Sequence, residues 1–371
     1  MRRLLIIFSL VGLVLGSLGL AVLAADWPFW QRAWHWQAAK AAKAGWPEQL
    51  PGVWQSLGQG QGAPMPAADA PESAALAQLA QREVPTTLLV SRAGVLIAEQ
   101  YATGVAADAL LQGRGLTAVV LAPLYGIARL QTGVDLLDRP LAVLLPEWRD
   151  DGRGAITPRQ LLWQTSGLAA PPFQPFNPFS DRARLASGPN FARAALGFAA
   201  VYPPGSHFEP SPANAQLLAL ALARARGQSF AQRLETDLWQ PLGAGRAQLV
   251  LDRPGGEMSA HCCLSATARD WLRLAQWLAS EGVVGGRHLL PAGFMAEMAV
   301  ASPVHPGQGL GVRVGQALSG ERLLWGESEG RLMLVVPERQ LAAVWFAQRA
   351  LPDEAAADLL RAVGLQAAQI N

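Results

Sequence analysis

The sequence predicts an α+β protein that has an antiparallel β-sheet flanked by helices, an added all-α lobe, and one transmembrane helix at the N-terminus. Three observations support this fold class. Strand-like runs lie near both ends of the globular part, helical signals dominate between about residues 116 and 245, and a charge-free apolar run begins at Leu4. Because the strands do not alternate with helices, a parallel sheet built from βαβ units is not expected.

The composition is that of a folded protein. The chain has 371 residues, of which 51% are hydrophobic and 16% are charged, so it can bury a large core. Its formal net charge is +2 and its basic residues form no cluster, which excludes a nucleic-acid partner. The two cysteines are adjacent at Cys262 and Cys263 and the five histidines are scattered, so no metal site and no cofactor are expected.

Residues 1–25 contain the apolar run, which extends from Leu4 to Ala25 and follows Arg2 and Arg3. At about 1.5 Å per residue, this run is long enough to span a hydrocarbon core of roughly 30 Å. The two arginines predict a cytoplasmic N-terminus. We therefore expect a single-pass protein of a bacterial inner membrane whose domain faces the periplasm, with the membrane as its first partner. A cleaved signal peptide, which would give a secreted or periplasmic protein, is the alternative.

Residues 26–84 connect this segment to the domain. Five aromatic residues near their start are expected to form an aromatic belt at the membrane interface: Trp27, Phe29, Trp30, Trp34 and Trp36. An amphipathic helix packed on the domain is the other arrangement that they allow. The stretch from Trp46 to Ala70 is rich in Pro, Gly and Gln, and it is expected to be a linker or an extended wrap before a short helix from Pro71 to Arg82.

Residues 85–371 are expected to form the domain, with the helical lobe inserted at about 116–245. Turn, cap and stop signals predict, in chain order, a hairpin over 86–101, helices starting at Thr157-Pro158, Ser211-Pro212 and Ser229, a helix over 265–282, three strand-like runs after Gly309, and a last helix from Asp353. Along the sequence, strands therefore precede and follow the helical lobe.

Seven segments carry a resemblance to a known superfamily. In order, they are LLVSRAGVLIAEQY, LYGIARLQTGVDLLDRPLAVLLPEW, ITPRQLLWQTSGL, YPPGSHFEPSPANAQLLALALARARGQSF, LWQPLGA, HCCLSATARDWLRLAQWL and GVVGGRHLLP. As a set they resemble the serine β-lactamase and penicillin-binding-protein superfamily, in its class C-like esterase and amide-hydrolase branch. The resemblance implies the β-lactamase/transpeptidase-like fold from about residue 85 to the C-terminus.

The same resemblance implies a catalytic constellation. Members use a Ser-x-x-Lys pair on a central helix, a Tyr-x-Asn or Tyr-Ser element from the helical lobe, and a Lys-Thr-Gly or His-x-Gly strand. Ser and Lys three residues apart share a helix face, so the amine can accept the hydroxyl proton, while the Tyr exchanges protons during acyl transfer.

All three motifs are degenerate in this chain. The Ser position falls on Gly115, the Lys position on Ala118 and the Tyr position on Pro210, and the third strand has acidic residues in Trp325-Gly326-Glu327-Ser328-Glu329-Gly330. The absence of any lysine after Lys43 excludes both Lys-containing motifs from the domain in every register. Neighbouring Arg114 cannot replace the base, because guanidinium stays protonated, and Pro123 is expected to kink or restart the central helix.

Several other side chains are candidates to replace the missing groups. Thr117, Ser166 and Ser211 are expected to have structural roles as core, loop and cap residues. Weak cleft candidates are His207, Glu209, Glu327, Ser328 and Glu329, of which the Glu pair is expected to point to one face of a strand and Ser328 to the other. A cationic ligand for the Glu pair is less favoured than a solvated strand end. A triad using His261 and Asp270 is not excluded, and Cys262 and Cys263 are expected to be buried thiols rather than a vicinal disulfide.

The sequence therefore predicts a catalytically inactive pseudoenzyme that works as a binding, scaffold or regulatory module. Loss of all three cooperating groups would remove most of the rate enhancement. The alternative is a serine-hydrolase-type esterase, amidase or peptidase with a relocated nucleophile. A third hypothesis is non-covalent capture of a cell-wall-derived small ligand, because Gly115 and Ala118 leave room in the cleft. The partner of the module is then either such a ligand or another protein.

Overall fold

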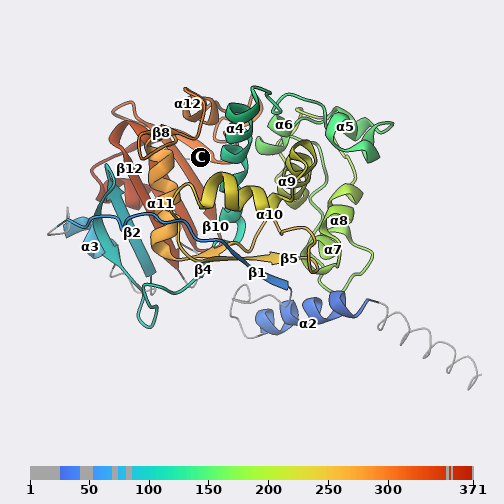
Figure 1. Ribbon diagram of the computed structural model, residues 1–371, viewed down its shortest axis with the longest axis horizontal. Helices are drawn as coiled ribbons and strands as arrows, with labels where there is room; N and C mark the ends of the chain where they lie inside the picture. The colour runs from blue at the N-terminus through green and yellow to red at the C-terminus, as the bar shows by residue number, and fades with distance from the viewer. Residues whose placement is uncertain are drawn as a thin grey trace, which may run out of the picture.

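The computed structural model describes residues 26–41, 53–68, 74–80, 86–347, 351 and 354–369. The predicted transmembrane helix or signal segment at 1–25 lies outside these residues. Within the described ranges no helix is both long and apolar enough to cross a bilayer. The fold class is the α+β class that the sequence predicts, with a large antiparallel sheet beside a group of helices (Figure 1).

A seven-stranded antiparallel sheet forms one half of the domain, in the order β13-β9-β10-β11-β12-β2-β3. Its strands are β2 (Thr86–Arg92), β3 (Val95–Gln100), β9 (Arg313–Ala317), β10 (Arg322–Ser328), β11 (Arg331–Val336), β12 (Leu341–Ala347) and β13 (Ala367–Gln369). The predicted hairpin is confirmed as β2–β3, with Ala93 and Gly94 at positive φ in its turn. Pairing of β2 with β12 closes the domain, since it joins the first and last strand-rich parts of the sequence.

Helices cover both faces of this sheet. In β12, Val344 and Phe346 belong to the larger core on the side of α11 (Ala268–Ala279), whereas Ala343 and Trp345 belong to a second core. That second core packs beneath α3 (Ala74–Ala80) and α13 (Ala355–Ala362). The alternation follows the two-residue period of a strand, and it explains why β12 is apolar throughout.

The helical lobe lies beside the sheet (Figure 1). Its helices are α4 (Leu121–Thr132), α5 (Leu141–Leu144), α6 (Pro158–Leu162), α7 (Asp181–Ser187), α8 (Phe191–Gly197), α9 (Pro212–Arg226) and α10 (Phe230–Arg233), the last continuing as a π-helical segment over Leu234–Trp239. Two predicted helix starts are confirmed, because Thr157 and Ser229 form capping boxes. Gly227 ends α9 in the left-handed conformation. Ser211 precedes α9 as predicted, but its side chain makes no cap hydrogen bond. A small helix α12 (Phe294–Met298) follows the two-stranded β7 (Val283–Val284) and β8 (Arg287–His288).

The described part of the Pro/Gly/Gln-rich stretch, residues 53–68, is an extended wrap that contains an unpredicted strand. β1 (Val53–Leu57) pairs with β5 (Ala247–Leu251), in a second sheet of order β1-β5-β6-β4 that also contains β6 (Ser265–Ala266) and β4 (Leu111–Gln112). Beyond β1 the wrap passes close to the backbone of Gly243, and a Cβ at Gly62 would lie 2.5 Å from its carbonyl oxygen. Glycine is therefore required where the two segments cross.

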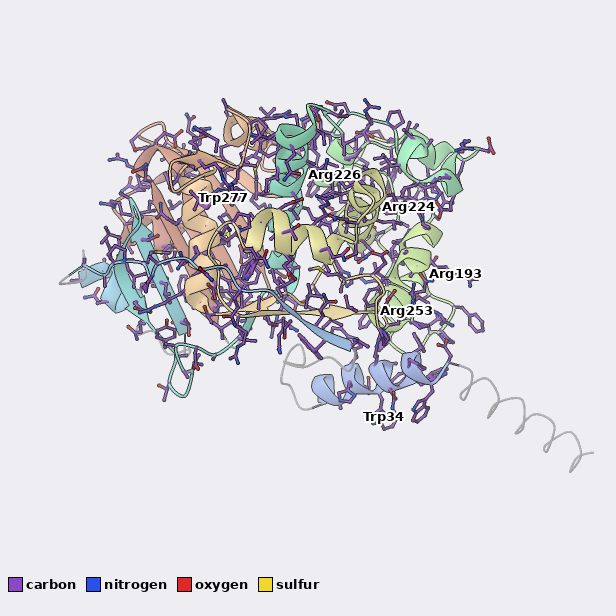
Figure 2. All side chains as sticks on the ribbon, in the orientation of Figure 1. Trp34, Arg193, Arg224, Arg226, Arg253 and Trp277 are labelled. Carbon is purple, nitrogen blue, oxygen red and sulfur yellow. A yellow bond between two sulfur atoms is a disulfide. The ribbon has the colours of Figure 1, made fainter. Side chains whose placement is uncertain are left out.

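Helix α2 (Trp27–Ala41) packs on the domain. The prediction of an aromatic belt at the membrane interface is therefore wrong for two of the five aromatic residues. Phe29 and Trp36 are buried against the domain, whereas Trp27 and Trp34 are 56% and 69% exposed. Buried Arg32 anchors the helix by donating to the carbonyl oxygens of Gly188 and Asp252, at 2.8 and 2.7 Å. Figure 2 shows Trp34 on the side of α2 that faces away from the domain.

Candidate functional site

A cavity of about 870 Å³ lies between the seven-stranded sheet and the helical lobe. The residues that line it include Trp36, Gly115, Leu116, Ala118, Val119, Gln164, Phe173, Pro175, Arg182, Leu185, Ala186, Phe208, Pro210, Ser211, Pro212, Ala215, His261, Gln308, Gly311, Val312, Arg313, Trp325, Gly326, Glu327, Ser328 and Glu329. The structure thus brings the three degenerate motif positions and the acidic strand end together in one cleft. His207 and Glu209 are not among the lining residues.

The central helix is reshaped where the nucleophile would stand. Residues Arg114–Val120 form a 3-10 helix, and the α-helix α4 starts only at Leu121, with Pro123 in its first turn. Proline is tolerated there because the first turn has no intrahelical acceptors for its missing N–H, so the predicted restart is confirmed. In a 3-10 helix, side chains three residues apart eclipse, which places Gly115 and Ala118 on the same side, toward the cleft.

Ser328 occupies the space next to Gly115. The N–H of Gly115 donates to the Oγ of Ser328 at 3.1 Å. A Cβ built on Gly115 would lie 2.6 Å from that Oγ and 3.0 Å from the Ser328 Cβ. A serine side chain at position 115 would therefore overlap with Ser328 in this arrangement.

At the acidic end of β10, the predicted alternation of side chains between the two faces of the strand fails at Glu329. Ser328 faces the 3-10 helix, as does Gly326, whose absent side chain makes room for Leu116 and Val119. Glu329, however, lies in the β10–β11 turn at φ 43°, so it leaves the strand pattern. Arg114 reaches over this turn and donates to the Glu329 carbonyl oxygen at 2.7 Å, with a further ion pair of 3.6 Å to the carboxylate.

The two remaining weak candidates, His207 and Glu209, do not meet across the cleft. His207 is exposed and its ring stacks on Tyr202 with centroids 4.2 Å apart, while the backbone N–H of Glu209 donates to the Gln164 carbonyl oxygen. Between them, Phe208 lines the cavity and stacks on His305. None of the three tyrosines of the chain lines the cavity.

The hydroxyls expected to be structural have structural partners. Thr117 is fully buried and accepts from the N–H of Leu264 at 3.2 Å. Ser166 is fully buried and donates to Asn214 Oδ1 at 2.7 Å. Ser211, although at the cavity wall, donates to the carbonyl oxygen of Ala169. None of these hydroxyls is hydrogen bonded to a general base that could remove its proton and make it a nucleophile.

The possible triad of His261 and Asp270 is not formed. Asp270 accepts from the N–H of Gly245 and from the Thr267 hydroxyl, so both of its oxygens are used at the start of α11. His261 lies at the cavity wall with Nδ1 3.3 Å from the Oγ of buried Ser259, and its burial, with the nearby charge of Arg182, lowers its pKa to about 4. The imidazole is therefore neutral at pH 7 and lacks the carboxylate partner of a triad.

Cys262 and Cys263 are joined as a vicinal disulfide, which differs from the expected pair of thiols. Both are buried in a small cluster with Trp36 of α2 and Val250 of β5. The disulfide therefore stands directly behind the cavity wall formed by Trp36 and His261.

Part of the cleft was not predicted from the sequence. Trp36, Phe173 and Arg182 line it from α2, from the loop before α7 and from α7 itself. No local pattern in the sequence marks them, because they come from separate segments that only the tertiary structure brings to one cavity. The described residues contain no group of three or more His, Cys, Asp or Glu side chains placed to hold a metal ion.

The chain matches one protein-family model and resembles several solved structures. The beta-lactamase family model matches residues 86–368. A protein of Bacillus anthracis described as a 6-aminohexanoate-dimer hydrolase has a similar structure, with a TM-score of 0.69 at 19% identity over 90% of this chain and 91% of that one. A penicillin-binding protein homologue from Caulobacter crescentus has a TM-score of 0.57 at 16% identity over 76% and 94%.

A third similar structure is EstCE1, described as a hydrolase with promiscuous acyltransferase activity, with a TM-score of 0.60 at 18% identity over 78% of this chain and 98% of that one. At these identities the likeness shows the fold alone. No curated protein sequence matches the chain.

Proposed function

The chain belongs to the beta-lactamase family, and we propose that it is a pseudoenzyme of this family that binds a small ligand in the inherited cleft without acyl transfer. Its scaffold and cleft are those of a hydrolase fold, but Gly115, Ala118 and Pro210 stand at the three motif positions. We favour a cell-wall-derived small molecule as the ligand. More broadly, we propose that the protein acts as a binding, scaffold or regulatory module, which includes binding of a protein partner.

One contact carries this proposal. The Ser328 hydroxyl is hydrogen bonded to the Gly115 N–H at the place where a nucleophile would project. The nucleophile is thus missing and its space is partly filled. The base is missing as well, since no lysine follows Lys43 and the neutral His261 is engaged with Ser259.

We further propose that the protein is held in a bacterial inner membrane by residues 4–25, with the domain in the periplasm. The support is the apolar run, the two preceding arginines, and the exposed aromatic side chains of α2 and of the loop before α7. Trp27, Trp34 and Phe179 are 56%, 69% and 91% exposed, and Trp34 lies edge-on to Phe176. Such rings suit a membrane interface. Alkaline extraction of membranes would leave an anchored chain in the pellet, whereas a cleaved signal segment would release it with a new N-terminus near residue 25.

The proposal that the protein does not catalyse acyl transfer is tested by intact-mass spectrometry of the full chain after incubation with a fluorescent penicillin and with p-nitrophenyl acetate. We expect an unmodified mass and hydrolysis at the rate of the buffer. A stoichiometric adduct, or turnover that one substitution abolishes, would show an active hydrolase instead. For the alternative function, a hydrolase with a relocated nucleophile, Ser328 is the candidate nucleophile, because its hydroxyl lies in the cavity and contacts a backbone N–H.

Ser328→Ala therefore discriminates between the two functions. If Ser328 is a relocated nucleophile, the adduct appears with the wild-type chain and disappears with Ser328→Ala. Ser211→Ala is the matched control, because Ser211 also lines the cavity but is bonded to a backbone carbonyl. For a pseudoenzyme, each of the three chains keeps its own unmodified mass.

A further inference from the structure

One end of the cavity is cationic and has no acid of its own. Arg182 lies on α7, lines the cavity and is half-buried. One guanidinium nitrogen donates to the carbonyl oxygen of Pro171 at 2.7 Å, and no carboxylate among the described residues pairs with it. Burial lowers the pKa of Arg182, the direction expected for a cation removed from water without a counter-ion.

His261 adds a neutral donor to this end of the cavity. The Ser259 Oγ lies 3.3 Å from Nδ1, and in the tautomer whose Nδ1 accepts the Ser259 proton, the proton of the imidazole is on Nε2. Nε2 has no protein partner among the described residues. Because burial and the charge of Arg182 keep the pKa of His261 at about 4, the ring does not become a second cation near neutral pH.

The walls around these two polar groups are apolar. Trp36 and Phe173 lie edge to face with centroids 5.4 Å apart, and Leu185 and Ala186 of α7 complete this side. The two acidic lining residues, Glu327 and Glu329, come instead from β10 and its turn, where Glu329 is paired with Arg114. The sheet border of the cleft therefore carries carboxylates together with the arginines Arg114 and Arg313, whereas the lobe border carries Arg182 and aromatic rings without a carboxylate.

We propose that Arg182, His261, Trp36 and Phe173 form an anion subsite that binds the carboxylate of a ligand whose remaining body is apolar or aromatic. This inference rests on the proposed ligand-binding role of the cleft and names the chemical class of the ligand. A guanidinium binds a carboxylate through two parallel hydrogen bonds, and in a partly desolvated cleft such a contact is stronger than at an open surface. The rings supply apolar area for the rest of the ligand.

The test is isothermal titration calorimetry of the full chain in detergent with three matched probes: 4-phenylbutyrate, 4-phenylbutanamide and 4-phenylbutylamine. We expect the acid to bind at least about tenfold more tightly than the amide, and the amine most weakly, since a hydrogen bond between two charged groups is stronger than one to a neutral amide. Arg182→Gln should remove this preference for the acid over the amide. Arg182→Lys should retain a smaller preference, because a point charge replaces the planar fork.

Arg313→Gln is the matched control, because Arg313 lines the same cavity from the exposed side of β9. It should change acid binding by less than about threefold. Equal affinities for acid and amide, an equal effect of the Arg182 and Arg313 substitutions, or no binding of any probe at millimolar concentration would overturn the subsite. Acylation or turnover in the mass-spectrometric experiment, together with a preserved acid preference, would instead overturn the pseudoenzyme proposal and leave the subsite standing.

Discussion

The Oγ of Ser328, at the end of β10, accepts a hydrogen bond from the N–H of Gly115, 213 residues earlier in the chain, at 3.1 Å. This contact joins the third motif strand to the segment that precedes the central helix. It has two effects on the cleft. It satisfies a backbone donor at the cleft surface, and it places a side chain where the side chain of residue 115 would be.

The first prediction concerns this pair. Gly115→Ala should lower the free energy of unfolding by about 1–2 kcal/mol, because the new Cβ would approach Ser328 to within 3.0 Å at its Cβ and 2.6 Å at its Oγ. Ser328→Gly should recover most of that loss in the double variant. Urea denaturation of the wild type, both single variants and the double variant measures the coupling. Strict additivity of the two substitutions would contradict the contact.

The second prediction concerns pH and His261. Its pKa in the folded protein is about 4, below its ordinary value of 6.5, so the folded state favours the neutral ring. The stability that depends on the neutral ring is complete above pH 6.5 and is lost as the pH falls toward 4. The loss is at most about 3 kcal/mol.

His261→Gln should lose less stability than the wild type between pH 6.5 and 4, as measured by urea denaturation at several pH values. The comparison removes the contribution of the carboxylates, which are common to both proteins. Parallel curves for the two proteins would show that His261 is not a buried neutral ring.

A third prediction tests the docking of α2. Arg32→Met removes the two hydrogen bonds to the carbonyl oxygens of Gly188 and Asp252 and leaves these acceptors without their donor. We expect the free energy of unfolding to fall by about 1–3 kcal/mol and hydrogen exchange to accelerate within residues 27–41. Gln31→Ala, at the neighbouring exposed position, is the control and should leave both unchanged.

The last prediction concerns the buried amide network below the cleft. Ser166 donates to Asn214 Oδ1, and Asn214 Nδ2 donates to Gln164 Oε1, each at 2.7 Å. Ser166→Ala should destabilise the fold by about 1–3 kcal/mol, since the Asn214 oxygen loses its described donor inside the protein. Thermal unfolding checks the loss. If Ser166→Ala instead abolished an acylation without changing stability, the hydroxyl would be a reacting group.

Much of the fold could be predicted from the sequence because it depends on local chemistry. The hairpin turn at Ala93-Gly94, the capping boxes at Thr157 and Ser229 and the restart at Pro123 each follow from one or two residues. The loss of the three motif positions is also a property of the sequence, since a side chain that is absent from the chain cannot be supplied by folding. The β1 strand was missed because its partner β5 lies about 190 residues away, and neither has a distinctive pattern alone.

The sequence by itself therefore determined the α+β class, the elements with strong local signals and the absence of the lysine and serine of the family motif. Only the tertiary structure decided what fills the vacated positions. Ser328 meets Gly115, Trp36 returns from α2 to the cleft, and Arg182 stands beside His261, because packing joins segments that are distant in the chain. Such contacts depend on how buried surfaces fit together, which no local pattern of residues records.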